Sequence, residues 1–403
     1  MNVLTVAGAH SENRKVVILG GAHGSLALAR SLGKAGADVY YITSDSPLAG
    51  WSRYVTKTIR LPAINESEIA DFLLNVAGQN NLANALLIPA SDREVKLVSQ
   101  YIGRLSPAFT ILLPEWDRLR WLCDKPYLYK RAVELGITPP ETYELSSADE
   151  ALELELVYPV ILKPNMGGGE GTLAKAKVIR VDDREAFVEA FGKAAKELGA
   201  KNIVVQQLIP GGGECQFSYA GFWWEGEPMA EFSARRSRQY PVDFGFTSTF
   251  VETVDAPEVI AAARTILASV RYSGLVEVEF KRDPRTGVLN ILDVNPRPWS
   301  WFALCAAAGA DLGKIMWDST NCRVAKDRIQ AVTSVSWIYL VRDLVSSVQL
   351  VMRGKLSPID YLASLRSVRA CAAFSWHDLK PGLLDFPLTV WRVLTRRILN
   401  ISI

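Results

Sequence analysis

The sequence predicts an α/β protein that begins with a doubly wound, mostly parallel sheet. Apolar runs of strand length recur along the first part of the chain, at residues 15–20, 36–43, 85–88 and 110–113. Between them lie stretches whose apolar residues have helical spacing, at residues 25–35, 66–79 and 94–103. Strands that alternate with helices form βαβ units, so residues 1–115 are expected to be one domain of this kind.

A glycine turn joins the first expected strand to the first expected helix. Gly20, Gly21 and Gly24 stand where a nucleotide-binding fold carries its phosphate turn, and Asp45 lies where an acid would bind a ribose. The spacing departs from G-x-G-x-x-G, which disfavours a dinucleotide site. The open alternatives are a small-molecule crevice at the strand ends and glycines needed only for close packing. His23 is read as a polar loop residue.

The composition limits the class of protein. A chain of 403 residues with 49% hydrophobic and 22% charged residues is globular and needs two or three domains. A net charge of +2, without a basic and aromatic stretch, argues against nucleic acid as a partner. Five dispersed cysteines and three histidines do not suggest a zinc site or a disulfide framework. The dispersed cysteines favour a reducing cytoplasm. No signal peptide or membrane-spanning run is expected.

Two expected strands that follow one another closely carry two acidic residues on one face. Residues 274–281 and 288–297 read as strands joined by a turn that contains proline and glycine. Alternation along the first strand places Glu277 and Glu279 on the same face. The same rule applied to the second strand brings three further polar residues together.

These three residues are Asp293, Asn295 and Arg297. If the strands pair as a hairpin, Glu279, Asp293 and Asn295 offer the hard oxygen ligands that magnesium prefers. Arg297 lies beside them and is suited to a phosphate. The alternative is a hairpin whose charged face is solvated.

A lysine precedes a glycine-rich loop in the middle of the chain. Lys163 ends an apolar strand that begins near residue 158. The glycines of the loop are Gly167, Gly168, Gly169 and Gly171. Backbone N–H groups of such a loop can cover phosphates, with the lysine supplying charge. The alternative is a flexible hairpin tip.

Three arginines lie close together further on, before a loop that contains proline and aromatic residues. They are Arg235, Arg236 and Arg238. Such a group is either a solvated surface or a binding site for an anionic substrate or a transferred phosphate. The pattern does not decide between the two.

Taken in order, these motifs resemble the ATP-grasp superfamily of carboxylate–amine ligases, over about residues 15–325. The resemblance extends to proteins related to the carbamoyl-phosphate synthase large chain and D-aspartate ligase. It implies a Rossmann-like domain at 1–115 and an ATP-grasp domain at 116–330 with a mobile lid at about 125–205. Residues 331–403 are expected to form a helical C-terminal appendage.

The resemblance also implies roles for individual residues. ATP phosphates would be bound by Lys125, Lys163, Gly167, Gly168, Gly169 and Gly171. The adenosine would be lined by Gln206, Gln207, Leu208 and Ile209, with Glu214 near the ribose. Magnesium, or manganese in its place, would be held by Glu279, Asp293 and Asn295. Catalytic side chains near the transferred phosphate would be Arg297, Lys163 and Arg236.

Two positions depart from the family pattern. Gln206 and Gln207 stand where the family often has an acid followed by lysine or another residue, and this weakens an adenine contact from the Gln206 side chain. Asp293 stands where the family more often has glutamate, so its shorter side chain puts bidentate coordination in doubt.

The resemblance implies an ATP- and magnesium-dependent ligase that activates a small carboxylate as an acylphosphate for attack by an amine. Amino acids are one class of substrate that would fit. Two alternatives are a nucleotide-binding sensor or assembly protein without turnover, and an NAD-dependent oxidoreductase that uses the first domain.

The last part of the chain lies outside the confident resemblance. Its apolar spacing predicts helices at residues 337–351, 358–372 and 386–399. From residue 351 onward, eight basic residues outnumber three acidic ones. Short amphipathic segments of this kind could lie weakly on the inner face of an anionic membrane. The favoured alternative is a helical cap on the ligase body or a contact between two copies in a homodimer.

Overall fold

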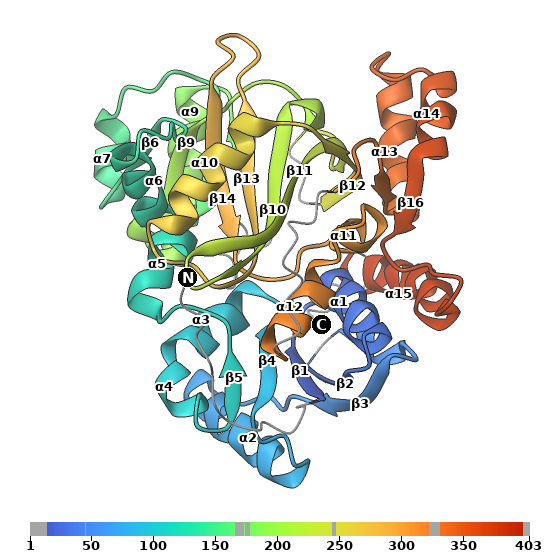
Figure 1. The fold of residues 1–403 in the computed structure, drawn as a ribbon. Coiled ribbons are helices and arrows are strands. Elements are labelled where there is room, and N and C mark those ends of the chain that lie inside the picture. Colours follow the sequence, from blue (N-terminus) through green and yellow to red (C-terminus); the bar gives the residue numbers. More distant parts are fainter. Residues whose placement is uncertain are drawn as a thin grey trace, which may run out of the picture.

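The computed structural model describes residues 14–44, 46–165, 173, 178–243, 247–321 and 331–397. The chain in these ranges forms three sheets with helices around them (Figure 1). The predicted α/β fold with a parallel N-terminal sheet is confirmed. Asp45 and the four glycines of the predicted phosphate loop lie outside the described residues.

The N-terminal sheet is parallel, with the strand order β3-β2-β1-β4-β5. Its strands are β1 (Lys15–Leu19), β2 (Asp38–Thr43), β3 (Val55–Arg60), β4 (Ala85–Pro89) and β5 (Phe109–Ile111). Its helices are α1 (His23–Lys34), α2 (Glu66–Gln79), α3 (Asp92–Gln100) and α4 (Ile102–Leu105). The single helix predicted at 94–103 is thus two helices that meet at Tyr101.

A small antiparallel sheet follows, in the order β6-β9-β7-β8. Its strands are β6 (Thr142–Glu144), β7 (Val160–Pro164), β8 (Ile179–Val181) and β9 (Ile203–Gln207). The helices before and around it are α5 (Trp116–Cys123), α6 (Lys125–Glu134), α7 (Ala148–Glu153) and α9 (Arg184–Leu198). Phe187 and Phe191 of α9 fill a core of their own against this sheet.

The large sheet has the order β14-β13-β10-β11-β12-β15-β16. Its central strands are β10 (Gln216–Trp224), β11 (Glu227–Tyr240), β12 (Thr247–Val254), β13 (Gly274–Arg282) and β14 (Leu289–Asn295). Helices α10 (Pro257–Ala268), α11 (Ala303–Ala307) and α12 (Leu312–Thr320) accompany it. Strand β12 was not predicted, and β11 continues through the three arginines to Tyr240. Pairing of β11 with β12 overrides the loop signal of the neighbouring proline and glycine.

The C-terminal segment differs from the all-helical prediction. It contains β15 (Ser336–Ile338), α13 (Leu340–Met352), α14 (Pro358–Ser364), β16 (Val368–Cys371) and α15 (Leu379–Arg397). Both strands were predicted as parts of helices, but β15 pairs with β12 and β16 pairs with β15. Partners distant in sequence therefore decide their conformation. None of the described helices is long and apolar enough to cross a membrane.

The two larger sheets share their hydrophobic cores. On one face, Val17 and Leu87 of the parallel sheet belong to the same buried cluster as Val276 and Val278 of β13. On the other face, Ile18 and the helix α1 join a cluster that reaches Trp301, after β14. The N-terminal domain is consequently packed directly against the sheet that carries the predicted metal ligands.

The glycine turn serves this packing. Gly20 and Gly21 have positive φ values of 73° and 76°, which disfavour other residues. A Cβ atom on Gly24 would lie 2.7 Å from the backbone oxygens of Pro298 and Trp299. This observation favours the packing alternative. His23 was wrongly read as a loop residue, because it begins α1 and its ring lies 4.7 Å from that of Tyr339.

Gly24→Ala should therefore lower the stability of the protein by about 1–3 kcal/mol, because the added methyl group meets backbone atoms of the loop after β14. Gly78→Ala, in α2, is a matched control with open space around the new Cβ and should not destabilise. Thermal unfolding of both variants measures the difference. Equal melting temperatures for the two variants would contradict this account of the turn.

Candidate active site

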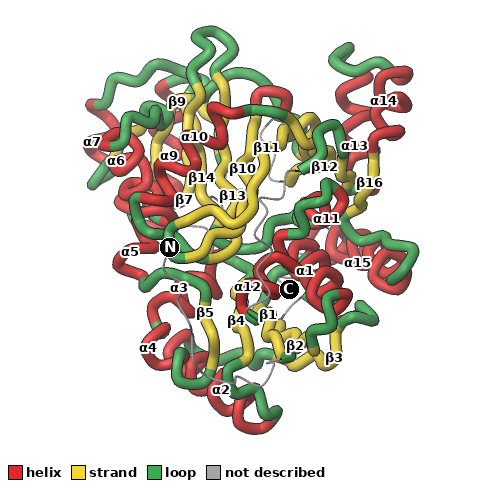
Figure 2. Tube along the Cα trace, in the orientation of Figure 1, coloured by secondary structure: helices red, strands yellow, loops and turns green. Residues whose placement is uncertain are grey.

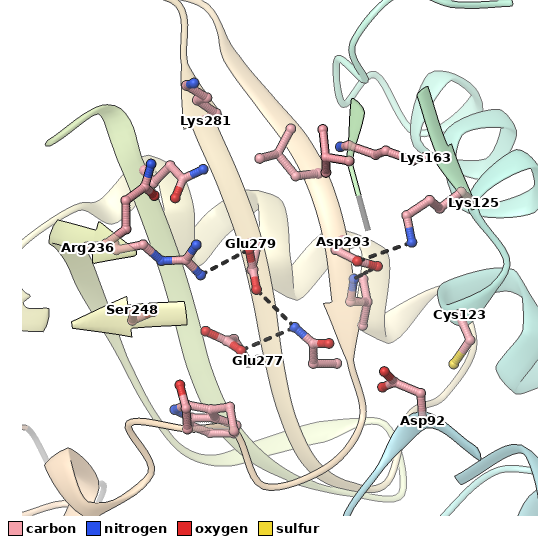
Figure 3. Close-up of a pocket in the computed structure, with 18 of the residues that line it drawn as sticks. Asp92, Cys123, Lys125, Lys163, Arg236, Ser248, Glu277, Glu279, Lys281 and Asp293 are labelled. Atoms are coloured by element: carbon pink, nitrogen blue, oxygen red, sulfur yellow. Dashed lines mark hydrogen bonds and ion pairs between the residues drawn. The ribbon is translucent and has the colours of Figure 1, made fainter. Parts of the chain in front are cut away.

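A cavity of about 400 Å³ opens where the three sheets meet. The small sheet contributes Lys163 and Gln206, and the N-terminal domain contributes Asp92 at the start of α3. The floor is the face of the large sheet that carries Glu279 and Asp293, as Figure 3 shows. Asp92 follows β4, so it lies at the carboxyl edge of the parallel sheet, where α/β proteins commonly bind ligands.

The expected hairpin is present, and its register brings the predicted metal ligands together. Glu279 lies opposite Asp293, and Glu277 lies opposite Asn295. The Nδ2 atom of Asn295 donates to Glu279 Oε1 at 3.1 Å and to Glu277 Oε2 at 3.2 Å. Its side-chain oxygen accepts a hydrogen bond from Arg297 Nη2 at 3.0 Å. The amide orientation is therefore fixed by neighbours on both sides.

Two cations neutralise the carboxylates of the hairpin. The Nζ atom of Lys125 lies 3.2 Å from Asp293 Oδ2, and Nη2 of Arg236 lies 3.2 Å from Glu279 Oε2 (Figure 3). Burial opposes the charge on Lys125, but Asp293 and other neighbours raise its pKa above the ordinary value. Lys125 begins α6, where Pro126 suits the first helical turn.

Arg297 connects the hairpin to the N-terminal domain. Its Nε atom lies 2.5 Å from Oδ1 of Asp92, which sequence reasoning did not select. Asp92 could have been noticed, since it follows an apolar strand at the edge where parallel strands end. This ion pair aligns the parallel domain with the floor of the cavity.

Lys163 lies across the cavity from the hairpin and donates to Gln206 Oε1 at 2.9 Å. Burial, with help from the nearby charge of Lys125, lowers the pKa of Lys163 to about 8. Its ammonium group has no carboxylate within ion-pair distance among the described interactions. The carboxylates of Asp293 and Glu279 act on it only from a longer distance, so an anionic ligand could supply a direct ion-pair partner.

Glu277 also lines the cavity. The sequence predicted that it shares a strand face with Glu279 but did not predict it as a site residue. It is 3% exposed, and Oε1 accepts hydrogen bonds from Ser218 and from the indole of Trp301, at 3.1 and 2.8 Å. Burial and the neighbouring charge of Glu279 raise the pKa of Glu277 well above its usual range. Its contact with Asn295 makes it a support for that amide.

Most of the remaining predicted residues also reach the cavity. Its wall includes the segment of Gln206, Gln207, Leu208 and Ile209. The backbone N–H groups of Gln207 and Leu208 already donate to Glu141 and Pro159. Glu214 is not part of the wall, because its exposed carboxylate turns back to accept from the N–H of Gly212.

The three arginines do not form one anion-binding group. Arg235 pairs with Glu252, and Arg238 pairs with Asp343, so only Arg236 of the three lies on the cavity wall. Strand geometry explains this divergence, because neighbouring side chains of β11 point to opposite faces and a register shift follows Arg236. The interpretation of the three arginines as one binding site for an anionic substrate is therefore wrong for Arg235 and Arg238.

The donor set of the hairpin suits a magnesium ion that completes its shell with ligand oxygens. Among the described residues, no group of three or more histidine, cysteine, aspartate or glutamate side chains is arranged to hold a metal. Glu279, Asp293 and Asn295 offer two carboxylates and one amide oxygen instead. Magnesium commonly binds one or two carboxylates together with phosphate oxygens and water. The side chains therefore fit a magnesium–nucleotide ligand.

Among the described residues, the thiol on the cavity wall belongs to Cys123. Burial and the nearby carboxylates of Asp92 and Asp293 raise the pKa of this thiol above its ordinary value. A thiol of this kind stays protonated and is a poor nucleophile. The chemistry that the cavity supports is therefore charge stabilisation by lysine and arginine rather than covalent catalysis by cysteine.

Comparison with known proteins agrees with this arrangement. No family model matches the chain. The C-terminal section of the carbamoyl phosphate synthase large chain of Methanopyrus kandleri is 25% identical over 233 residues, which are 54% of this chain and 42% of that protein. D-aspartate ligase of Enterococcus faecium is 22% identical over 231 residues, which are 53% of each chain. The chain thus spans about half the length of the curated relatives it matches.

A solved structure is similar over more of the chain. The crystal structure of a biotin carboxylase–β,γ-ATP complex from Campylobacter jejuni covers 80% of this chain and 74% of its own, with a TM-score of 0.62 and 15% identity. The order of the three sheets and the position of the cavity are consistent with the ATP-grasp architecture. The chain is a distant relative of the two curated proteins and resembles the ATP-grasp superfamily.

Proposed function

We propose that this protein is an ATP- and magnesium-dependent ligase that activates a small carboxylate as an acylphosphate and joins it to an amine. One observation carries the proposal. Two carboxylates and an amide suited to magnesium share a single cavity with Lys125, Lys163, Arg236 and Arg297. The curated relatives are named as part of a synthase and as a ligase, and this supports the proposal.

ATP would lie between the small sheet and the hairpin. Lys125 and Lys163 face this space and would bind its phosphates, while Leu208 and Ile209 offer apolar surface for the adenine. Gly167, Gly168, Gly169 and Gly171 remain proposed as the loop over the phosphates. Glu214 would need to turn toward the cavity to meet the ribose.

Glu279, Asp293 and Asn295 would hold magnesium, or manganese, which supplies charge neutralisation between phosphate oxygens when it is bound. Arg236 and Arg297 would stabilise the charge that develops on the transferred phosphoryl group. Glu277 keeps the amide of Asn295 oriented so that its oxygen stays on the side of Arg297. In these assignments, Lys125 and Lys163 neutralise the phosphates of ATP, and Arg236 and Arg297 neutralise the transferred phosphoryl group.

The proposed reaction needs no nucleophile from the protein, because the two substrates supply the attacking atoms. An oxygen of the substrate carboxylate attacks the γ-phosphorus, the bond to the β–γ bridging oxygen breaks, and ADP leaves. The amine nitrogen then attacks the acyl carbon, phosphate leaves, and the nitrogen loses a proton. The glycine loop proposed over the phosphates would keep water from the acylphosphate in the interval.

A small polar substrate fits the end of the cavity near Arg236. Gln239 also lines the cavity, and its buried Oε1 has no hydrogen-bond partner in the described structure. A guanidinium and an amide acceptor in one cavity suit the carboxylate and amino groups of an amino acid. We propose amino acids as the substrate class, and the cytoplasm, where ATP is abundant, as the site of the reaction.

The first test measures the release of ADP and phosphate in the presence of magnesium and ATP. Amino acids and small carboxylates are supplied singly and in pairs. Release should require one carboxylate and increase with one amine, with an amide as the product by mass spectrometry. Tight ATP binding without release for any pair would instead favour a nucleotide sensor.

Glu279→Ala and Asp293→Ala should each lower the rate of ADP release by about 100-fold or more, because each removes a carboxylate from the proposed magnesium site. Glu134→Ala, on the exposed surface of α6, removes a carboxylate of the same kind away from the cavity. This control should retain full activity. Similar rates for all three variants would exclude the proposed role of the hairpin.

The affinity for ATP should decrease above about pH 8, where Lys163 loses its proton. Its pKa is lowered, so the charge is present below that pH and disappears above it. The dissociation constant should rise by up to about tenfold per pH unit beyond this point. Lys163→Arg keeps its charge at every accessible pH and should flatten the profile. Isothermal titration calorimetry between pH 7 and 10 measures the dissociation constant of ATP for wild type and Lys163→Arg. The same pH dependence in both proteins would contradict the role of Lys163.

A further inference from the structure

The helices of the C-terminal segment turn polar residues inward and apolar residues outward. In α13, the buried residues are Asp343, Ser346 and Ser347. The exposed large side chains of the same helix are Leu340, Leu344, Val345, Val348 and Met352. Their spacing places them on one side of the helix. A helix on a water-exposed surface normally has the opposite arrangement.

Helix α15 repeats this arrangement. Asp385 is 5% exposed and faces the body of the protein, where it lies 3.3 Å from His23. The exposed side chains of this helix include Leu379, Leu383, Phe386 and Val390. They recur at i, i+4, i+7 and i+11 and therefore form one stripe. Two helices that are separate in sequence thus share the same unusual orientation.

Buried ion pairs hold these helices in place. Asp343 accepts two hydrogen bonds from Arg238, from Nε and from Nη2, each at 2.9 Å. Asp378, directly before α15, accepts from Arg30 at 2.9 Å and from Ser52 at 2.6 Å. Turning either helix to bury its apolar stripe would leave buried charges unpaired, which is costly. The outward stripes are therefore a fixed feature of the fold.

Most of the exposed large apolar side chains of the described chain gather in this segment. Outside residues 340–391 they are Val133, Val157, Val288 and Val332. Within the segment, α14 adds Ile359 and Leu362, and the loop before α15 adds Trp376, which is 80% exposed. Helices α13, α14 and α15 lie along one side of the molecule, as Figure 2 shows. We call the outward apolar side chains of α13, α14, α15 and this loop the apolar edge.

The charges around the apolar edge are mainly positive. Three acidic residues of the segment, Asp343, Asp378 and Asp385, are buried, and Asp360 is exposed. The exposed basic residues are Arg353, Lys355, Arg366, Arg369 and Lys380, of which Arg353 pairs with Asp243 at 2.7 Å. An apolar surface with a basic border matches the acyl chains and anionic headgroups of a lipid bilayer.

We propose that the apolar edge rests on the surface of an anionic phospholipid bilayer, with α13 and α15 lying in the interface rather than crossing it. Because the polar faces of these helices point inward, their apolar faces point outward and need an apolar partner. The basic residues around the apolar edge favour a partner with anionic groups. The described helices are too short or too polar to span a membrane, which agrees with an interfacial position. This inference does not depend on the proposed ligase reaction.

The test mixes the full-length protein with vesicles of phosphatidylcholine alone or of equal parts phosphatidylcholine and phosphatidylglycerol. Sedimentation of the vesicles separates bound from free protein. Wild type should bind the anionic vesicles, and should bind less to neutral vesicles or at high salt.

Val348→Glu/Met352→Glu in α13 and Leu383→Glu/Phe386→Glu in α15 should each lower the partition constant by about tenfold or more. Val133→Glu/Val288→Glu replaces exposed valines elsewhere and should bind like wild type. All positions changed are exposed, and circular dichroism confirms that each variant folds.

Three results would overturn the proposal. The first is no binding of wild type to anionic vesicles. The second is equal binding by wild type and by the α13 and α15 variants. The third is a dimer in lipid-free solution, seen by analytical ultracentrifugation, that the α13 and α15 variants dissociate, since the apolar edge would then be covered by a second copy.

Discussion

The pairing of β13 with β14 is the constraint on which the rest of the site depends. Its register places Glu279 opposite Asp293 and Glu277 opposite Asn295, and the period of two points these side chains into one cavity. A shift of one residue would turn all of them toward the buried core on the other face. Val278 and Val294 fill that core. The burial of these valines therefore also fixes the strand register that directs the polar side chains into the cavity.

The polar groups of the hairpin are satisfied by residues from distant parts of the chain. Lys125 comes from a helix, Arg236 from a neighbouring strand, and Asp92 reaches Arg297 from the N-terminal domain. A concentration of buried charge is stable only when such partners are present. The close contact of Gly24 with the loop after β14 lets the N-terminal domain approach, and this approach brings Asp92 within reach.

The C-terminal segment contacts the rest of the protein in a different way. Its strands add apolar residues such as Trp337 to the core of the body. Its helices are instead held by buried polar pairs, Arg238 with Asp343 and Arg30 with Asp378, and expose their large apolar side chains. Sequence spacing predicted amphipathic helices there, but it could not say which face was buried. The polar partners that decide this are more than 100 positions away, with separations of 105 and 348 residues.

Local periodicity and the order of the motifs were sufficient to predict the parallel N-terminal sheet, the facing carboxylates of the hairpin and the resemblance to ATP-grasp proteins. Tertiary structure alone decided that Arg235, Arg236 and Arg238 separate, that Glu277 and Asp92 join the cavity, and that β12, β15 and β16 are strands. Each of these depends on partners that local spacing does not specify. A strand becomes stable when a neighbour supplies its hydrogen bonds, and a charged side chain is committed to the partner that the fold brings within reach.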